Sequence, residues 1–150
     1  MFYLASYAFM NVGAFAVVTH FARQGEQYLK IDEMAGLAKR QPATAALLTV
    51  FLLSLIGVPL TGGFFGKFYV FKSAMDVADH QLLWLVIIGV VNSAISIYYY
   101  LRIVTAMYFR EATEPFAPSR SGALTFVMVL CPIVILAMGI LPGFWLGLGK

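Results

Sequence analysis

The sequence is poor in charged residues. Asp, Glu, Lys and Arg make up 11% of its 150 residues, whereas a soluble domain usually carries about a quarter. Hydrophobic residues make up 61% of the chain, and a soluble protein of this length could not bury so much apolar surface. The scarcity of charge therefore excludes an ordinary soluble domain.

Cysteine and metal-binding side chains are also scarce. Cys131 is the only cysteine, so the sequence excludes internal disulfides, CxxC redox motifs and cysteine-ligated iron–sulfur sites. The two histidines, His20 and His80, lie far apart and give no metal-binding pattern. No glycine-rich nucleotide fingerprint is present. We therefore expect no metal and no cofactor in this chain. The net charge of +3 is spread over loops and span ends, so nucleic acid is not an expected partner.

Long apolar runs are what the sequence does contain. A helix needs about 20 mostly apolar residues to cross a bilayer. Four candidate spans cover about residues 2–22, 42–75, 82–109 and 122–148. We predict an all-α membrane protein, a single transmembrane domain of four helices in a lipid bilayer. Because the first span begins at residue 2, we expect the chain to be the C-terminal part of a larger protein.

The second candidate span is too long for one straight helix. Residues 42–75 would extend about 50 Å as a continuous helix, against roughly 30 Å of hydrocarbon. Proline removes a backbone donor, and glycine weakens a helix. We therefore predict two half-helices joined by an unwound segment between about residues 57 and 66, where protein or water must surround the backbone. The residues that predict the break are Gly57, Pro59, Gly62, Gly63 and Gly66.

Lys67 follows this predicted break directly. The residues three and four positions away on a helix are apolar, and no acid lies within any predicted span. Apolar surroundings favour the neutral amine of a lysine, so such a lysine can take up and release a proton, which an arginine cannot do. Charges inside a membrane usually mark function. We predict that Lys67 is a proton relay; the alternative is that its side chain reaches out to the membrane interface.

Other polar residues give weaker signals. Asn92, Ser96 and Tyr99 recur at helical spacing in the third span. Hydrogen bonding between helices is the preferred interpretation, and a water-lined proton path is the alternative. His20 lies near the end of the first span, where it could shuttle protons. An ordinary histidine at the membrane interface is the preferred interpretation there.

The basic residues predict the orientation. Two loops on one side of the predicted membrane domain hold six of them: Arg23, Lys30, Lys39, Arg40, Arg110 and Arg120. The opposite side holds only Lys72 and Lys150. Positive charge concentrates on the cytoplasmic side of membrane proteins. We therefore expect these two loops in the cytoplasm and the C-terminus outside it.

Four segments resemble a known family: YAFMNVGAF (7–15), IDEMAGLAKRQP (31–42), LLSLIGVPLTGGFFGKFYVF (52–71) and YYYLRIVTAMYF (98–109). They resemble the last four spans of subunit N of bacterial NADH-quinone oxidoreductase, an antiporter-like subunit of respiratory complex I. In that family a discontinuous late helix carries a lysine implicated in proton translocation, and Lys67 occupies the matching place. The resemblance implies a proton-translocating subunit of the bacterial inner membrane, which couples NADH oxidation and quinone reduction to proton transfer.

The resemblance also implies partners. They would be the other membrane subunits of the complex, with NADH, FMN, iron–sulfur clusters and quinone bound in partner subunits and none in this chain. Two alternatives stay open. The chain could belong to a multi-subunit cation/proton antiporter or a membrane-bound hydrogenase, which share this fold, or it could be a truncated, non-catalytic membrane scaffold.

Overall fold

The computed structural model describes residues 1–21, 31–76, 82–111 and 121–147. All elements in these ranges are helical, as predicted. In chain order they are α1 (Phe2–Phe21), η1 (Ile31–Met34), α2 (Leu37–Arg40), α3 (Pro42–Ile56), α4 (Gly62–Met75), α5 (Leu83–Phe109), α6 (Gly122–Ile140) and α7 (Pro142–Gly147).

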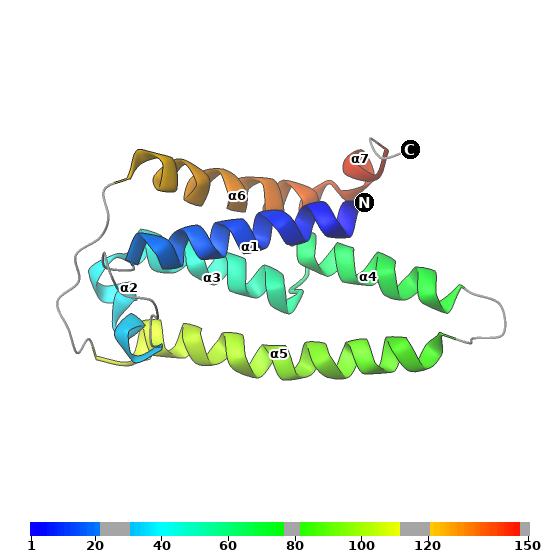
Figure 1. Ribbon diagram of the computed structural model, residues 1–150, viewed down its shortest axis with the longest axis horizontal. Helices are drawn as coiled ribbons and strands as arrows, with labels where there is room; N and C mark the ends of the chain where they lie inside the picture. The colour runs from blue at the N-terminus through cyan, green and yellow to red at the C-terminus, as the bar shows by residue number, and fades with distance from the viewer. Residues whose placement is uncertain (22–30, 77–81, 112–120, 148–150) are drawn as a thin grey trace.

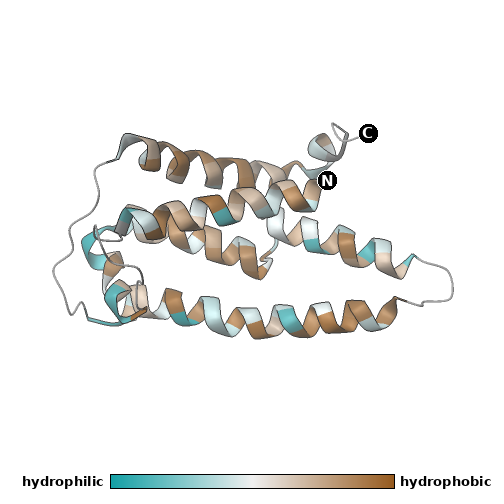
Figure 2. Ribbon diagram, viewed as in Figure 1, coloured by the Kyte–Doolittle hydropathy of each residue, from teal (hydrophilic) through white to brown (hydrophobic). Residues whose placement is uncertain are grey.

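The long helices lie side by side along one axis (Figure 1). Helix α1 packs against α6 on one side and against α3 and α4 on the other, and α5 packs against the far side of α3 and α4. The most deeply buried side chains include Met10 and Val17 of α1, Phe51 of α3, Met107 of α5 and Ile135 of α6. Apolar residues cover most of the long helices, and the largest group of polar residues lies around η1 and α2 at one end of the molecule (Figure 2). This distribution suits an apolar solvent around the middle of the molecule.

Among the residues that the structure describes, three helices are long and apolar enough to cross a membrane: α1, α5 and α6. Helix α3 is a shorter apolar helix of 15 residues, and α4 adds 14 residues after it. Neither half reaches the length of about 20 residues that one crossing requires. Three of the four predicted spans therefore contain one helix of sufficient length, whereas the second contains two short ones.

The predicted fourth span, 122–148, is divided in the structure. Helix α6 ends at Ile140 and α7 begins at Pro142. Because Pro142 has no N–H group, it cannot donate to the carbonyl four residues earlier, and its ring disfavours continuation of the helix before it. Pro132, in contrast, lies inside α6 without ending it.

The break in the second predicted span is shorter than the glycines suggested. Helix α3 ends at Ile56 and α4 begins at Gly62, so the non-helical segment covers residues 57–61. The prediction that Gly62, Gly63 and Gly66 belong to the break is wrong, since all three lie within α4. They serve close packing instead. A Cβ on Gly66 would lie 3.0 Å from the ring of Tyr3 in α1, so glycine lets α4 approach its neighbours closely.

Candidate functional site

The end of α3 leaves backbone carbonyls without helical donors. Gly57 has a φ of 95°, in the left-handed region that ends many helices. The amides of Gly57 and Val58 both donate to the carbonyl of Leu53, at 3.0 Å each. The next donor in the helical pattern would be residue 59, but Pro59 has no N–H group. The carbonyl of Leu55 therefore needs a donor from outside the helix.

Lys67 supplies that donor. Its Nζ donates hydrogen bonds to the carbonyl oxygens of Leu55, at 2.8 Å, and Ile56, at 3.0 Å. These are the last two carbonyls of α3, where the helix dipole places partial negative charge. The half-buried side chain thus reaches back across the break rather than out along α4. The amine occupies the position where the backbone lacks a partner.

Gly57 lies directly beside this side chain. A Cβ at position 57 would lie 3.4 Å from Cδ and 3.8 Å from Nζ of Lys67. Any other residue there would also be strained by the positive φ. The backbone conformation that ends α3, rather than the space beside the lysine, is therefore what requires glycine at this position.

Ser54 joins the two halves of the broken helix. Its fully buried hydroxyl accepts a hydrogen bond from the amide of Gly63, at 3.3 Å, and donates to the sulfur of Met10, at 2.9 Å. A Cβ on Gly63 would overlap the backbone carbonyl of Ser54. The first turn of α4 therefore rests directly on the last turn of α3.

Two cavities adjoin Lys67. The first has a volume of about 220 Å³, and its lining includes Asn92, Ser93, Ser96 and Tyr100 of α5. The second, of about 200 Å³, is lined mainly by apolar side chains. Both include Lys67 and Ser93 in their lining. The lysine is therefore open to space on the side where α5 lies.

The structure brings some predicted site residues together and leaves others apart. Asn92 and Ser96 line the first cavity with Lys67, whereas Tyr99 lines neither cavity and is 59% exposed. Tyr100 takes the place that Tyr99 was expected to occupy. Helical spacing from Ser96 allows a step of three or four residues, and the run of three tyrosines gave no means of choosing between them.

His20 does not join this site. It lies in the last turn of α1 and lines neither cavity. Of the α1 residues that line the first cavity, Met10 comes nearest to His20 in the chain, and it lies roughly 15 Å away along the axis at 1.5 Å per residue. Direct proton exchange between His20 and Lys67 is therefore excluded by distance.

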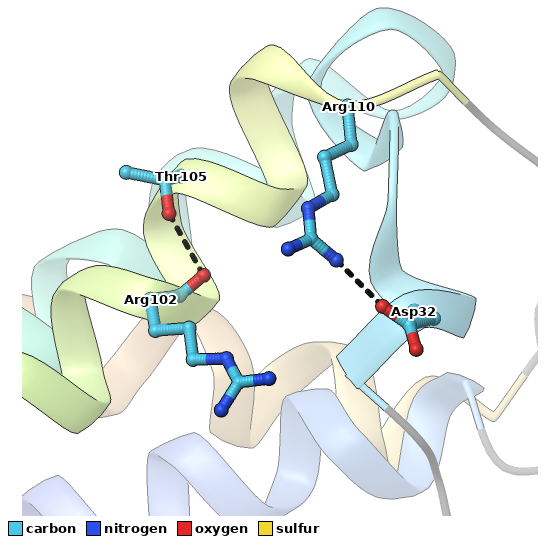
Figure 3. Close-up of polar contacts among 4 residues, drawn as sticks. All are labelled: Asp32, Arg102, Thr105 and Arg110. Carbon is cyan, nitrogen blue, oxygen red and sulfur yellow. Dashed lines mark hydrogen bonds and ion pairs between the residues drawn. The ribbon is translucent and has the colours of Figure 1, made fainter.

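An ion pair ties the other end of the molecule together. Arg110, just after α5, donates to Asp32 of η1 with an Nη1–Oδ1 distance of 2.6 Å (Figure 3). Nearby, the amide of Gly36 donates to the carbonyl of Ala106 in α5, at 3.3 Å. Within the described ranges, no group of three or more His, Cys, Asp or Glu side chains is placed to hold a metal ion.

Comparison with known proteins assigns the fold to a family. The family model described as "NADH:quinone oxidoreductase/Mrp antiporter, TM" matches residues 1–96. NADH-quinone oxidoreductase subunit N 1 of Solibacter usitatus is 53% identical over 150 residues, which cover 96% of this chain and 29% of that protein. Subunit N of Bdellovibrio bacteriovorus is 43% identical over 143 residues, which cover 95% of this chain and 29% of the relative.

A solved structure agrees with these relatives. A chain in respiratory complex I from Thermus thermophilus with bound aureothin matches 95% of this chain with a TM-score of 0.79 and 32% identity, over 32% of its own length. The chain thus spans about 29% of the length of the curated relatives. The comparisons do not support the prediction that it is the C-terminal portion of such a subunit. The matched family model and the fold together show that this chain belongs to the NADH:quinone oxidoreductase/Mrp antiporter transmembrane family.

Proposed function

We propose that this chain is part of a proton-translocating membrane subunit of an NADH-quinone oxidoreductase, of the subunit N type, and that Lys67 carries the proton. The observation that supports this proposal most is the position of the Lys67 amine. It donates to two carbonyls at a helix break and adjoins two cavities. A charge placed inside a membrane protein beside non-helical backbone is the usual arrangement of an ion-translocation site.

The surroundings of Lys67 give both protonation states a source of stability. The carbonyls of Leu55 and Ile56 stabilise the ammonium form through charge-assisted hydrogen bonds. The apolar neighbours Phe64 and Phe71 favour the neutral amine. The first cavity, of about 220 Å³, has room for several water molecules at about 30 Å³ each. Asn92 and Ser96 are polar enough to hold such water, so the proton would reach Lys67 from this side.

The proposal also includes the membrane location of the chain, its membrane spans and its partner subunits. We propose that it lies in the bacterial inner membrane, that α3 and α4 together form one discontinuous span, and that α1, α5 and α6 form the other three. The other membrane subunits of the complex would be its partners. NADH, FMN, iron–sulfur clusters and quinone would be bound in partner subunits, and this chain would contact quinone only through the complex.

Affinity purification tests the proposed assembly. The protein that contains this chain, tagged and extracted from membranes in mild detergent, should bring down an assembly that oxidises NADH and reduces quinone. Activity should be measured spectrophotometrically on the purified assembly and compared with an untagged preparation from the same membranes. Recovery of an assembly without NADH oxidation would contradict the proposal.

The family description itself favours a second candidate, because it names the Mrp antiporter as well. Under this alternative the same lysine would serve a cation/proton antiporter or a membrane-bound hydrogenase. A purified assembly that exchanges Na⁺ for protons in liposomes, or that oxidises hydrogen, without oxidising NADH would establish it. An assembly with none of these activities would leave a scaffold role.

The orientation has a separate test. We propose that α2 faces the cytoplasm, and that the C-terminal ends of α4 and α7 face the outside. In a Cys131→Ala background, Lys39→Cys should resist a membrane-impermeant thiol reagent in right-side-out vesicles, and Asp76→Cys should react. Both positions are exposed, at opposite ends of the α3–α4 pair. Because basic residues favour the cytoplasmic side, labelling of Lys39→Cys alone would show that the orientation is reversed.

A further inference from the structure

The end of α6 touches the helix break with its backbone. Gly139 of α6 is buried, and a Cβ there would overlap the carbonyl of Leu60 and lie 2.6 Å from Cα of Thr61. The neighbouring Gly62 is also close to α6, since a Cβ there would lie 3.2 Å from Cβ of Met138, although its tightest contact would be with Oγ of Ser6 in α1, at 2.6 Å. At Gly139 no side chain separates α6 from the backbone of the break. The position of α6 therefore fixes the position of the Leu60–Thr61 peptide.

The segment held in this way is short and strained. Leu60 has a φ of 73°, which is uncommon for any residue except glycine. The Thr61 hydroxyl donates to the carbonyl of Val58, at 2.7 Å, and the Thr61 amide donates to the same oxygen, at 3.3 Å. Strained backbone persists only where its surroundings hold it. Through these hydrogen bonds, a displacement of Leu60 or Thr61 would also displace Val58 and the adjacent Gly57.

The other end of the segment meets Lys67. Gly57 lies beside the lysine side chain, and the two carbonyls that accept its hydrogen bonds come just before Gly57. Helix α6 lies on the opposite side of the α3–α4 pair from α5 (Figure 1). No residue of α6 lines either cavity at Lys67. The contact with Gly139 is therefore separate from the site that it supports.

We propose that Gly139 is a positioning residue for Lys67: its missing side chain lets α6 hold the Leu60–Thr61 peptide, and this contact keeps the carbonyls of Leu55 and Ile56 where one amine reaches both. The consequence of this positioning for proton pumping rests on the proposed function of Lys67. The geometric part of the proposal concerns only the hydrogen bonds of the Lys67 amine. It can be tested without any measurement of activity.

Chemical modification of Lys67 tests the geometry. The assembled protein in membranes would be treated with acetyl N-hydroxysuccinimide, and acetylation of Lys67 would be followed by mass spectrometry. Gly139→Ala should raise the rate roughly fivefold, the factor expected when one hydrogen bond to the amine is lost. Gly143→Ala is the matched control, because it lies near the same end of the molecule and a Cβ there meets nothing within 4 Å.

A second variant covers the case in which Gly139→Ala does not assemble. Thr61→Val keeps the size of the side chain but removes the hydrogen bond to Val58, so it loosens the segment without overpacking α6. It should raise the acetylation rate in the same direction. An unchanged rate in Thr61→Val and in every assembled Gly139→Ala preparation would overturn the proposal. A higher rate in either variant, with Gly143→Ala unchanged, would support it.

Pumping measurements separate this proposal from the proposed function. If Gly139→Ala raises the acetylation rate and lowers the number of protons pumped per NADH while the assembly stays intact, both ideas are supported. If the acetylation rate rises but neither Gly139→Ala nor Lys67→Ala changes pumping, the geometry holds and the proton-carrying role of Lys67 fails. If only Lys67→Ala changes pumping and acetylation is unaffected, the role of Gly139 fails alone.

Discussion

Replacing Lys67 by alanine should lower NADH-driven proton pumping about a hundredfold, which is the lower end of what a proton-transferring side chain contributes. The alanine has no group that can carry a proton, and it leaves the carbonyls of Leu55 and Ile56 without their donor. Quinone reduction that is coupled to pumping should fall with it. Pumping would be followed by a pH-sensitive dye in inverted membrane vesicles, with NADH oxidation recorded in the same sample.

Two further variants make this result specific. Lys67→Arg should also be impaired, because arginine keeps its charge at every relevant pH. Lys72→Ala is the control, since Lys72 is exposed and points about 140° away around α4; it should pump as the parent does. If Lys67→Ala pumped normally in a fully assembled complex, Lys67 would only donate hydrogen bonds to the end of α3, and the proposed role as a proton relay would be wrong.

Gly63→Ala should destabilise the protein, although glycine-to-alanine changes within helices usually stabilise by about 0.5–1 kcal/mol. The added methyl group would overlap the backbone carbonyl of Ser54, and neither group can rotate away. Overpacking of this kind costs typically about 1–3 kcal/mol and occasionally more. It would also separate α4 from α3 and displace Lys67 from its carbonyls. Assembly, or the thermal midpoint of the purified complex together with pumping, should therefore fall sharply.

Gly122→Ala is the matched control for this change. Gly122 begins α6, and a Cβ there meets nothing within 4 Å. Its thermal midpoint, measured by unfolding of the purified complex, should stay the same or rise slightly. A Gly63→Ala complex as stable and active as the Gly122→Ala complex would show that the two half-helices are not in the tight contact described above.

The position of the helix break could be predicted from Pro59, but its extent could not. A proline inside an apolar run removes a donor wherever it lies, so a break near residue 59 follows from local chemistry alone. A glycine permits either unusual backbone angles or close packing, and the sequence does not distinguish these uses. Gly57 has the first use, whereas Gly63 and Gly66 have the second.

The site was predictable as far as Lys67 and the polar face of α5. Asn92 and Ser96 have the helical spacing that places them on one face, and they line the cavity beside Lys67. The acceptors of the lysine were not predictable, because a backbone carbonyl carries no sequence signal. Tyr100, and not Tyr99, lines that cavity, and the sequence does not predict this because the side of a helix that faces its neighbours depends on packing partners far away in the chain.

The hydrogen bonds of Lys67 make the end of α3 responsive to the charge that the lysine carries. A positive charge at a helix C-terminus contributes about 0.3–1 kcal/mol through the helix dipole. Each time Lys67 lost its proton, that contribution would vanish from the last turn of α3, and it would return with the next proton. The arrival and departure of one proton would thus alternately stabilise and destabilise the last turn of α3. A change of charge on one side chain would in this way alter the stability of the backbone at the helix break.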